Sequence, residues 1–348
     1  MRETMSEHDP HPTPTARPPE RVTSPLVTDL AYVRLAIVNA YLYGARGVGD
    51  GGWVLIDAGI PGSAARILRA AADRFGEDAR PAAIILTHGH FDHVGAARTL
   101  AERWDVPVYA HELELPYLTG RSPYPSPDPT VGGGAMAALS RLYPRGPVDL
   151  RPRVRTLPAD GSVPGMPGWR WLHTPGHTPG HVSLFRDSDR VLLAGDAVVT
   201  TRQESAIAVA TQRPEIHAPP AYFTQDWDSA RDSVRALAAL EPAVIATGHG
   251  PPMSGDAALQ ALQTLARYFD RWGLPPRGRY VRRPAIADER GTVWVPPGAP
   301  DPLPKLLLGV GALVAAGVAL SVRSRRHEAR GRTAARDGGV RRRITDGG

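Results

Sequence analysis

The 348-residue sequence contains no cysteine. This absence excludes disulfide bonds, thiolate nucleophiles, iron–sulfur clusters and any zinc site with a cysteine ligand. Lysine is nearly absent as well, because 40 of the 41 basic residues are arginine and Lys305 is the only lysine. Schiff-base catalysis and phosphate binding by a P-loop lysine are therefore excluded over the main body of the chain.

The net charge of +6 is concentrated at one end of the chain. Residues 323–348 carry nine arginines against Glu328, Asp337 and Asp346, which gives +6, so the preceding 322 residues sum to zero. A basic surface is the electrostatic signature of proteins that bind nucleic acid. Because the body of the chain is neutral, we expect a small-molecule substrate and no nucleic-acid partner.

Short apolar runs alternate with amphipathic segments, and glycine and proline, 36 of each, separate them. Interleaved strands and helices of this kind predict an α/β layered domain of roughly 250 residues. The predicted strands lie within 33–43, 53–57, 82–86, 106–110, 169–173, 181–185, 191–193 and 243–247, and the predicted helices at 63–75, 95–104, 229–240 and 257–272.

Composition also predicts the domain boundaries. Residues 1–25 are polar and rich in proline and threonine, which is typical of a disordered leader. The α/β domain is expected over 26–275, with a proline- and glycine-rich stretch at 118–152 that is predicted to be a lid or an insertion. A Pro/Arg-rich extension follows at 276–304, then an apolar segment at 305–322, and a basic tail at 323–348.

The apolar segment is a candidate transmembrane or interfacial helix. Its 17 uncharged residues, 306–322, would span about 26 Å, which is short for a membrane helix. The arginines that follow favour a cytoplasmic flank, yet a single span would place the body and the tail on opposite sides. A tail anchor, an exported body, a helix in the membrane interface and a helix packed on the protein itself remain open. We predict membrane association through this segment, with a cytoplasmic active site.

The segment from Thr87 to His93 reads Thr-His-Gly-His-Phe-Asp-His and follows an apolar strand. In an extended chain His88 and His90 point the same way and can hold one ion. If a helix begins near Asp92, then Asp92 and His93 turn toward a second ion. Neutral imidazole and carboxylate are the ligands that zinc, iron and manganese take at nitrogen and oxygen sites.

Three further segments complete this pattern. The first is the histidine-containing loop 173–181, which proline and glycine stiffen; the others contain Gly195-Asp196 and Thr247-Gly248-His249. Each follows a predicted strand, so all can converge on one edge of a layered sheet structure, where α/β proteins build their sites.

With these motifs the chain, from about residue 30 to 270, resembles the metallo-β-lactamase superfamily. The resemblance implies a four-layered αβ/βα sandwich, here with a C-terminal apolar helix added. It implies that His88, His90 and His177 bind one metal, that Asp92, His93 and His249 bind a second, and that Asp196 bridges both. It also implies that Asp57 supports the metal loops without binding metal.

The lack of cysteine separates this chain from the commonest β-lactamases of the superfamily, which place a cysteine where Asp196 stands here. The chain is similar to the glyoxalase II-like and lactonase-like branch. This resemblance implies two divalent ions, zinc first with iron or manganese as alternatives, and a bridging hydroxide that attacks an ester, thioester or lactone. Asp92 and Asp196 are the expected catalytic carboxylates. A phosphodiesterase and a non-catalytic, membrane-associated scaffold are the alternative functions.

Other residues are predicted to have supporting roles. His181 and His173 are expected to be structural or to support the ligands, and His111 is expected to be structural. His217 could approach the site. The aromatic side chains Tyr222, Phe223 and Trp227 could either line a substrate pocket or pack in the core.

Overall fold

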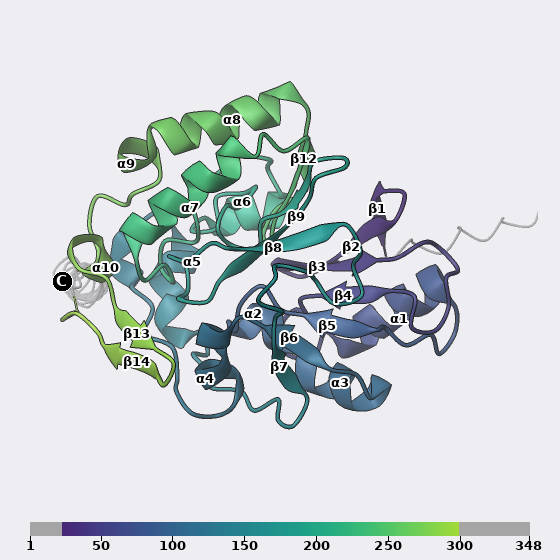
Figure 1. The fold of residues 1–348 in the computed structure, drawn as a ribbon. Helices are drawn as coiled ribbons and strands as arrows, with labels where there is room; N and C mark the ends of the chain where they lie inside the picture. The colour runs from purple at the N-terminus through teal and green to yellow at the C-terminus, as the bar shows by residue number, and fades with distance from the viewer. Residues whose placement is uncertain (1–22, 299–348) are drawn as a thin grey trace, which may run out of the picture.

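Two β-sheets lie face to face at the centre of the computed structural model, which describes residues 23–298 (Figure 1). The first sheet is antiparallel from its first to its fourth strand and parallel from its fourth to its seventh. Its order follows the chain: β1 (Ser24–Val27), β2 (Leu30–Leu35), β3 (Val38–Tyr43), β4 (Val54–Ile56), β5 (Ala83–Ile85), β6 (Val108–Ala110) and β7 (Val154–Thr156).

The second sheet has five strands, in the order β12-β11-β10-β9-β8. Only its β10–β11 pair is parallel, so these two strands end at the same edge of the sheet. The strands are β8 (Trp169–His173), β9 (Val182–Arg186), β10 (Val191–Leu193), β11 (Val244–Ala246) and β12 (Met253–Ser254).

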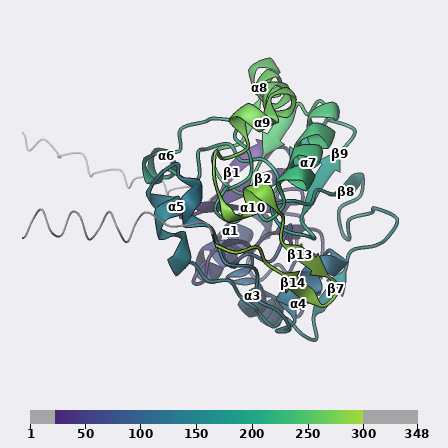
Figure 2. The same cartoon turned by 90° about the vertical axis from the view of Figure 1, so that its left-hand side faces the viewer.

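Helices cover the outer face of each sheet, as the two views show (Figures 1 and 2). The first sheet is covered by α1 (Ala64–Phe75) and α3 (Ala97–Trp104), and the second by α7 (Trp227–Ala239) and α8 (Asp256–Arg267). The short helices are α2 (Phe91–Val94), α4 (Leu115–Leu118), α5 (Ala135–Leu139), α6 (Ala206–Thr211), α9 (Phe269–Trp272) and α10 (Arg279–Arg282), with 3-10 turns at Glu112–Glu114, Pro129–Val131 and Ser140–Leu142.

Alternation along the strands explains why the layers stack in this way. In β4, Val54 and Ile56 pack between the two sheets, whereas Leu55 points outward to the helices. In β10, Val191 and Leu193 likewise face the other sheet, and Leu192 faces α7 and α8. A strand that is buried on both faces needs apolar side chains at successive positions, which is the pattern of these short runs. The expected four-layered arrangement, with two sheets between two layers of helices, is therefore confirmed.

Some elements differ from the sequence-based expectation. The single helix predicted over 257–272 is divided, because Tyr268 has non-helical angles (φ −115°, ψ 31°) between α8 and α9. Phe269 then lies in the core against Trp227, with ring centroids 6.2 Å apart. The boundary placed at residue 25 falls inside β1.

The Pro/Arg-rich extension contains α10 and a hairpin, β13 (Ile286–Asp288) and β14 (Gly291–Trp294), neither of which its composition indicated. Tyr280 is buried and donates its hydroxyl hydrogen bond to the Ser126 carbonyl. The Thr292 backbone N–H donates to the Ser122 hydroxyl oxygen, 3.1 Å away. The described part of the extension, up to residue 298, thus packs on the 118–152 segment.

Between residues 23 and 298, none of the helices combines the length and the apolar character that a bilayer span requires. The apolar segment 305–322, the basic tail and most of the leader lie outside the described residues. Membrane association through the apolar segment therefore stays a prediction.

His111 gives a prediction that concerns stability. Burial first, and then the neighbouring His173 imidazole, lower the pKa of His111 to about 4, whereas an unfolded histidine titrates near 6.5. The unfolded chain therefore binds the proton first, and this contribution to stability is lost as the pH falls from about 6.5 to about 4. In His111→Asn the side chain can still accept the Leu113 N–H, now 3.2 Å from His111 Nδ1, but it cannot titrate.

We expect this variant to show a shallower fall in unfolding free energy over that range, by up to about 1.4 kcal/mol per pH unit. Urea unfolding at several pH values measures the slope. An unchanged slope would contradict the assignment.

Candidate metal centre

All seven predicted ligands lie beyond strand ends at one edge of the two sheets. His88, His90, Asp92 and His93 follow β5, and the last two belong to α2. The other three come from the β8–β9 loop (His177), the end of β10 (Asp196) and the end of β11 (His249). Since β10 and β11 are parallel, with Leu193 beside Ala246, Asp196 and His249 leave the sheet together. Every one of these residues is 5% exposed or less.

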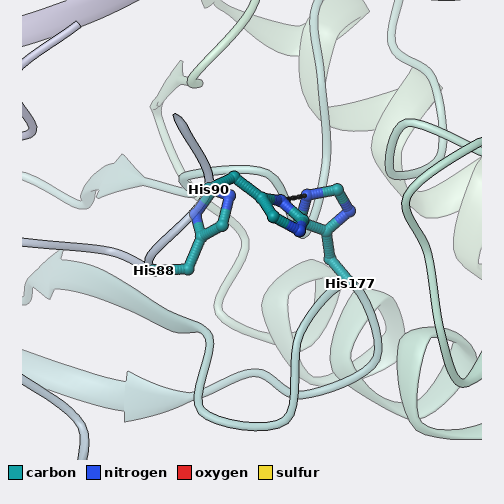
Figure 3. A group of neighbouring side chains, drawn as sticks. All are labelled: His88, His90 and His177. Atoms are coloured by element: carbon teal, nitrogen blue, oxygen red, sulfur yellow. Dashed lines mark hydrogen bonds between the residues drawn. The ribbon is translucent and has the colours of Figure 1, made fainter. Parts of the chain in front are cut away.

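His88, His90 and His177 form the first group (Figure 3). Their candidate ligand atoms all lie within 4.8 Å of one another. His90 Nδ1 and His177 Nε2 are 3.0 Å apart, and the three rings are nearly perpendicular in pairs, at 85° to 88°. The nitrogens thus converge from different directions on one point, as ligands of a single ion do.

Asp92, His93 and His249 form the second group, and Asp196 lies between the two groups. Asp196 Oδ1 is 3.5 Å from His93 Nε2. Asp196 Oδ2 is 3.0 Å from His249 Nε2 and 3.5 Å from His177 Nε2. One carboxylate therefore faces ligands of both groups.

The residues fit a pair of divalent ions. His88 Nε2, His93 Nε2 and Asp196 Oδ1 are buried without a hydrogen-bond partner, which is costly in a folded protein. Two ligands about 2.0–2.1 Å from a tetrahedral ion lie about 3.4 Å apart, close to the separations found here. Histidine and carboxylate donors suit zinc, iron or manganese.

Hydrogen bonds to residues that are not ligands hold the imidazole rings of the ligands in place. His249 Nδ1 donates to the Ile37 carbonyl at 2.7 Å, which leaves Nε2 free to accept. Asp57 Oδ2 lies 2.8 Å from His93 Nδ1, and the Asp57 carboxylate also accepts the Thr87 N–H and hydroxyl, each at 2.8 Å. Such contacts fix the tautomer and the orientation of a ligand. Asp57 lies beneath the ligand loop and belongs to none of the ligand groups, as the resemblance implied.

The electrostatic environment keeps most of the imidazoles neutral. Burial, with the neighbouring imidazoles, lowers the pKa of His88 and His90 well below the ordinary value, and burial lowers the pKa of His177 to about 3. Burial raises the pKa of Asp196, but His249 and His93 outweigh it, and the net pKa lies well below the usual range. The first group therefore offers neutral nitrogen lone pairs, and Asp196 offers an ionised carboxylate, the forms that bind metal. Burial lowers the pKa of His93 and His249, but Asp196 outweighs it and raises both pKa values, so a bound cation would displace a proton from these two imidazoles.

Other predicted residues surround this centre. His181 Nε2 accepts the Asp196 N–H at 2.9 Å and so helps to place that residue. Tyr222, Phe223 and Trp227 all pack in the apolar cluster beneath the second sheet's helices. Phe223 is in addition stacked on His90, with centroids 4.5 Å apart, and Tyr222 lies beside it. His217 forms an isolated bridge with Val199 and belongs to no ligand group among residues 23–298.

The sequence did not indicate two buried residues that form hydrogen bonds with the ligand loops, Glu114 and Tyr124. Neither lies in a histidine motif, so no pattern singled them out. It also missed Asn39, whose side chain donates to the carbonyls of Thr247 and Gly250 and thereby holds the loop of His249.

Comparisons with known proteins agree with this geometry. Residues 33–249 match the family model described as the metallo-beta-lactamase superfamily. The "Probable metallo-hydrolase YflN" of Bacillus subtilis (strain 168) is 53% identical over 214 residues, which cover 62% of this chain and 81% of that protein. "Probable metallo-hydrolase YybB" of the same strain is 31% identical over 196 residues, which cover 56% and 74%. A crystal structure of a β-lactamase domain protein from Burkholderia ambifaria is similar in fold, with a TM-score of 0.50, 21% identity and coverage of 71% of this chain and 73% of that one.

Proposed function

Because the chain belongs to the metallo-β-lactamase superfamily, we propose that it is a two-metal hydrolase that cleaves an ester, thioester or lactone bond of a small molecule. The observation that carries this proposal is the convergence of seven buried side chains in groups whose ligand atoms lie within 4.8 Å. His88, His90 and His177 would hold one ion, Asp92, His93 and His249 the other, and Asp196 would contact both.

When bound, two such ions lower the pKa of water toward neutrality and polarise a carbonyl oxygen. The protein supplies the remaining elements of the mechanism. Asp196 and the imidazoles fix the ligand positions, and the burial of every ligand excludes bulk water. Asp92 Oδ2 lies 3.5 Å from His249 Nε2, and burial raises the pKa of Asp92. As a metal ligand Asp92 would be ionised, so its carboxylate could orient a water molecule and accept its proton.

An aromatic wall beside His90 suits an apolar part of the substrate. Phe223 packs on His90, and the rings of Phe91 and Tyr143 lie 6.3 Å and 6.1 Å from Phe223. Phe91 and Tyr143 are only partly buried, so they can contact a bound molecule. Zinc is the first candidate metal, with iron or manganese as alternatives, because the donor set admits all three.

Metal removal tests the proposal. We expect purified full-length protein to hold about two ions per chain, and chelation to lower kcat/KM for a carbonyl substrate by at least about 10³-fold, about 4 kcal/mol of transition-state stabilisation. Added Zn²⁺, Fe²⁺ or Mn²⁺ should restore activity. Elemental analysis and a panel of lactone, ester, thioester and phosphodiester substrates provide the measurements.

The same panel separates the alternatives. Cleavage of the phosphodiester alone would replace the proposal with a phosphodiesterase. Protein that holds two ions but cleaves no substrate of the panel would favour a binding scaffold instead.

A further inference from the structure

Glu114 ends the 3-10 turn after β6 and is completely buried. Its carboxylate receives four hydrogen bonds from two different loops and an inserted segment. Oε2 accepts the Gly89 N–H at 2.9 Å and the Tyr124 hydroxyl. Oε1 accepts the Thr178 hydroxyl and the Gly180 N–H, each at 2.8 Å. The two oxygens of an ionised carboxylate offer about four acceptor positions, and these four donors fill them.

These donors lie next to the first metal group in the chain. Gly89 stands between His88 and His90, and Thr178 directly follows His177. The Glu114 carboxylate therefore joins the two loops that carry all three ligands of that group. The second group, Asp92, His93 and His249, makes no hydrogen bond to Glu114 among the described residues.

The glycines of both loops allow this close approach. A Cβ at Gly89 would lie 2.6 Å from the Tyr124 hydroxyl oxygen, and a Cβ at Gly180 would lie 2.8 Å from Glu114 Cγ. Real Cβ atoms essentially never come so close to other atoms. The Gly-containing motifs thus have a packing function that is separate from their histidines.

Tyr124 connects the 118–152 segment to the same carboxylate. Besides donating to Glu114, its hydroxyl oxygen accepts the Gly89 N–H at 2.9 Å. Its ring lies against His90, with centroids 4.5 Å apart, and stacks on Tyr117 at 3.9 Å. Through Tyr124, the 118–152 segment therefore packs against His90 and helps to hold the first ligand group in place.

We propose that Glu114 is a positioning residue that fixes the separation of His90 and His177, and so sets the metal affinity of the first group, with Tyr124 acting through it. The proposal rests on the metal binding in the proposed function. It concerns the metal affinity of the first ligand group only. A metal titration can therefore test it without a measurement of hydrolysis.

The variant Glu114→Gln keeps the side-chain volume but replaces one acceptor oxygen with an NH₂ donor. The new NH₂ group must then face two of the four donors, either Gly89 and Tyr124 or Thr178 and Gly180. One of the two loops therefore loses its hydrogen bonds to residue 114. Tyr124→Phe keeps the ring on His90 and removes only the hydroxyl. Asp128→Asn is the matched control, because Asp128 is a buried carboxylate that accepts the backbone N–H groups of Thr130 and Arg279, and its side chain makes no hydrogen bond to a ligand loop among residues 23–298.

The experiment titrates full-length, chelator-treated protein with Zn²⁺ and resolves two dissociation constants by calorimetry. We expect Glu114→Gln to weaken one of the two binding steps by 10–100-fold, the usual cost of losing a residue that supports a ligand, and to leave the other within about twofold. Asp57→Asn, which frees His93, should weaken the other step. Tyr124→Phe should have a smaller effect, and the Glu114→Gln/Tyr124→Phe double variant should be no weaker than Glu114→Gln. Asp128→Asn should match the wild type.

Several outcomes would overturn the proposal. Glu114→Gln could lower the melting temperature of the metal-free protein and leave both dissociation constants unchanged, which would make Glu114 merely structural. It could instead weaken the same step as Asp57→Asn, or the effects of Glu114→Gln and Tyr124→Phe could simply add. Wild-type protein that binds none of Zn²⁺, Fe²⁺ and Mn²⁺ would overturn both proposals, whereas two binding steps without hydrolysis would overturn only the proposed function.

Discussion

Asp196→Asn should abolish hydrolysis while the chain stays folded. Among residues 23–298, Asp196 is the one carboxylate within 3.5 Å of imidazoles from both ligand groups, His177 in the first and His93 in the second. The amide cannot supply the ionised oxygens that two cations require, and metal ions bind amide oxygens less tightly than carboxylates. We expect fewer than two ions per chain and a loss of kcat/KM of at least about 10³-fold, about 4 kcal/mol.

Folding should survive because Asp196 itself belongs to none of the three apolar clusters of the described residues, and asparagine has nearly the same volume as aspartate. Elemental analysis, circular dichroism and the hydrolysis assay of the purified variant check these expectations. Asp128→Asn, a second buried carboxylate replaced by its amide, controls for the chemical change and should keep both ions and full activity. An Asp196→Asn protein that holds two ions and hydrolyses at the wild-type rate would disprove the two-metal centre.

Much of the fold could be predicted from the sequence because the short strands are apolar on both faces. The runs around Val54, Ile85 and Leu192 have no polar position, which indicates a strand buried between a helix layer and a second sheet. Glycine or proline follows several of these strands within a few residues, as Gly59 follows β4, Gly89 follows β5 and Gly195 follows β10. The histidines and carboxylates that follow those strands can therefore be grouped into one site from the sequence alone.

The elements that the sequence did not reveal are held by contacts distant along the chain. The hairpin β13–β14 has strands of three and four residues, too short to show periodicity, and it is held partly by Ser122, 170 residues from Thr292. The break at Tyr268 depends on the packing of Phe269 against Trp227, which no local propensity records.

Glu114 shows the same limit at the site. An isolated glutamate after a strand has no sequence signature, because such a residue is usually exposed to solvent. Its role becomes visible only when Gly89 and Gly180, which are 91 residues apart, donate to the same carboxylate. Ligand residues were thus predictable from motifs, whereas the residues that hold the ligands required the structure.

Gly248 lies at the centre of the site and yields a prediction with a purely steric cause. A Cβ at this position would lie 2.1 Å from Asp196 Oδ1 and 2.7 Å from His93 Cε1. The backbone cannot retreat easily, because the Gly248 N–H donates to the Gly195 carbonyl and its own carbonyl accepts the Asn39 N–H, both at 2.8 Å. The added methyl group must therefore displace the Asp196 carboxylate or the His93 ring.

We expect Gly248→Ala to lower kcat/KM by about 10²-fold or more, since a displacement of about 1 Å at a reacting centre has that effect. Overpacking should also lower the unfolding free energy by about 1–3 kcal/mol. Gly52→Ala is the matched control: the three atoms nearest to its Cβ would all belong to Val48, a 41% exposed side chain that can move aside. Steady-state kinetics, Zn²⁺ titration and urea unfolding of both variants measure the effects. If Gly248→Ala bound two ions and turned over substrate as Gly52→Ala does, Asp196 and His93 would not need the positions that make them metal ligands.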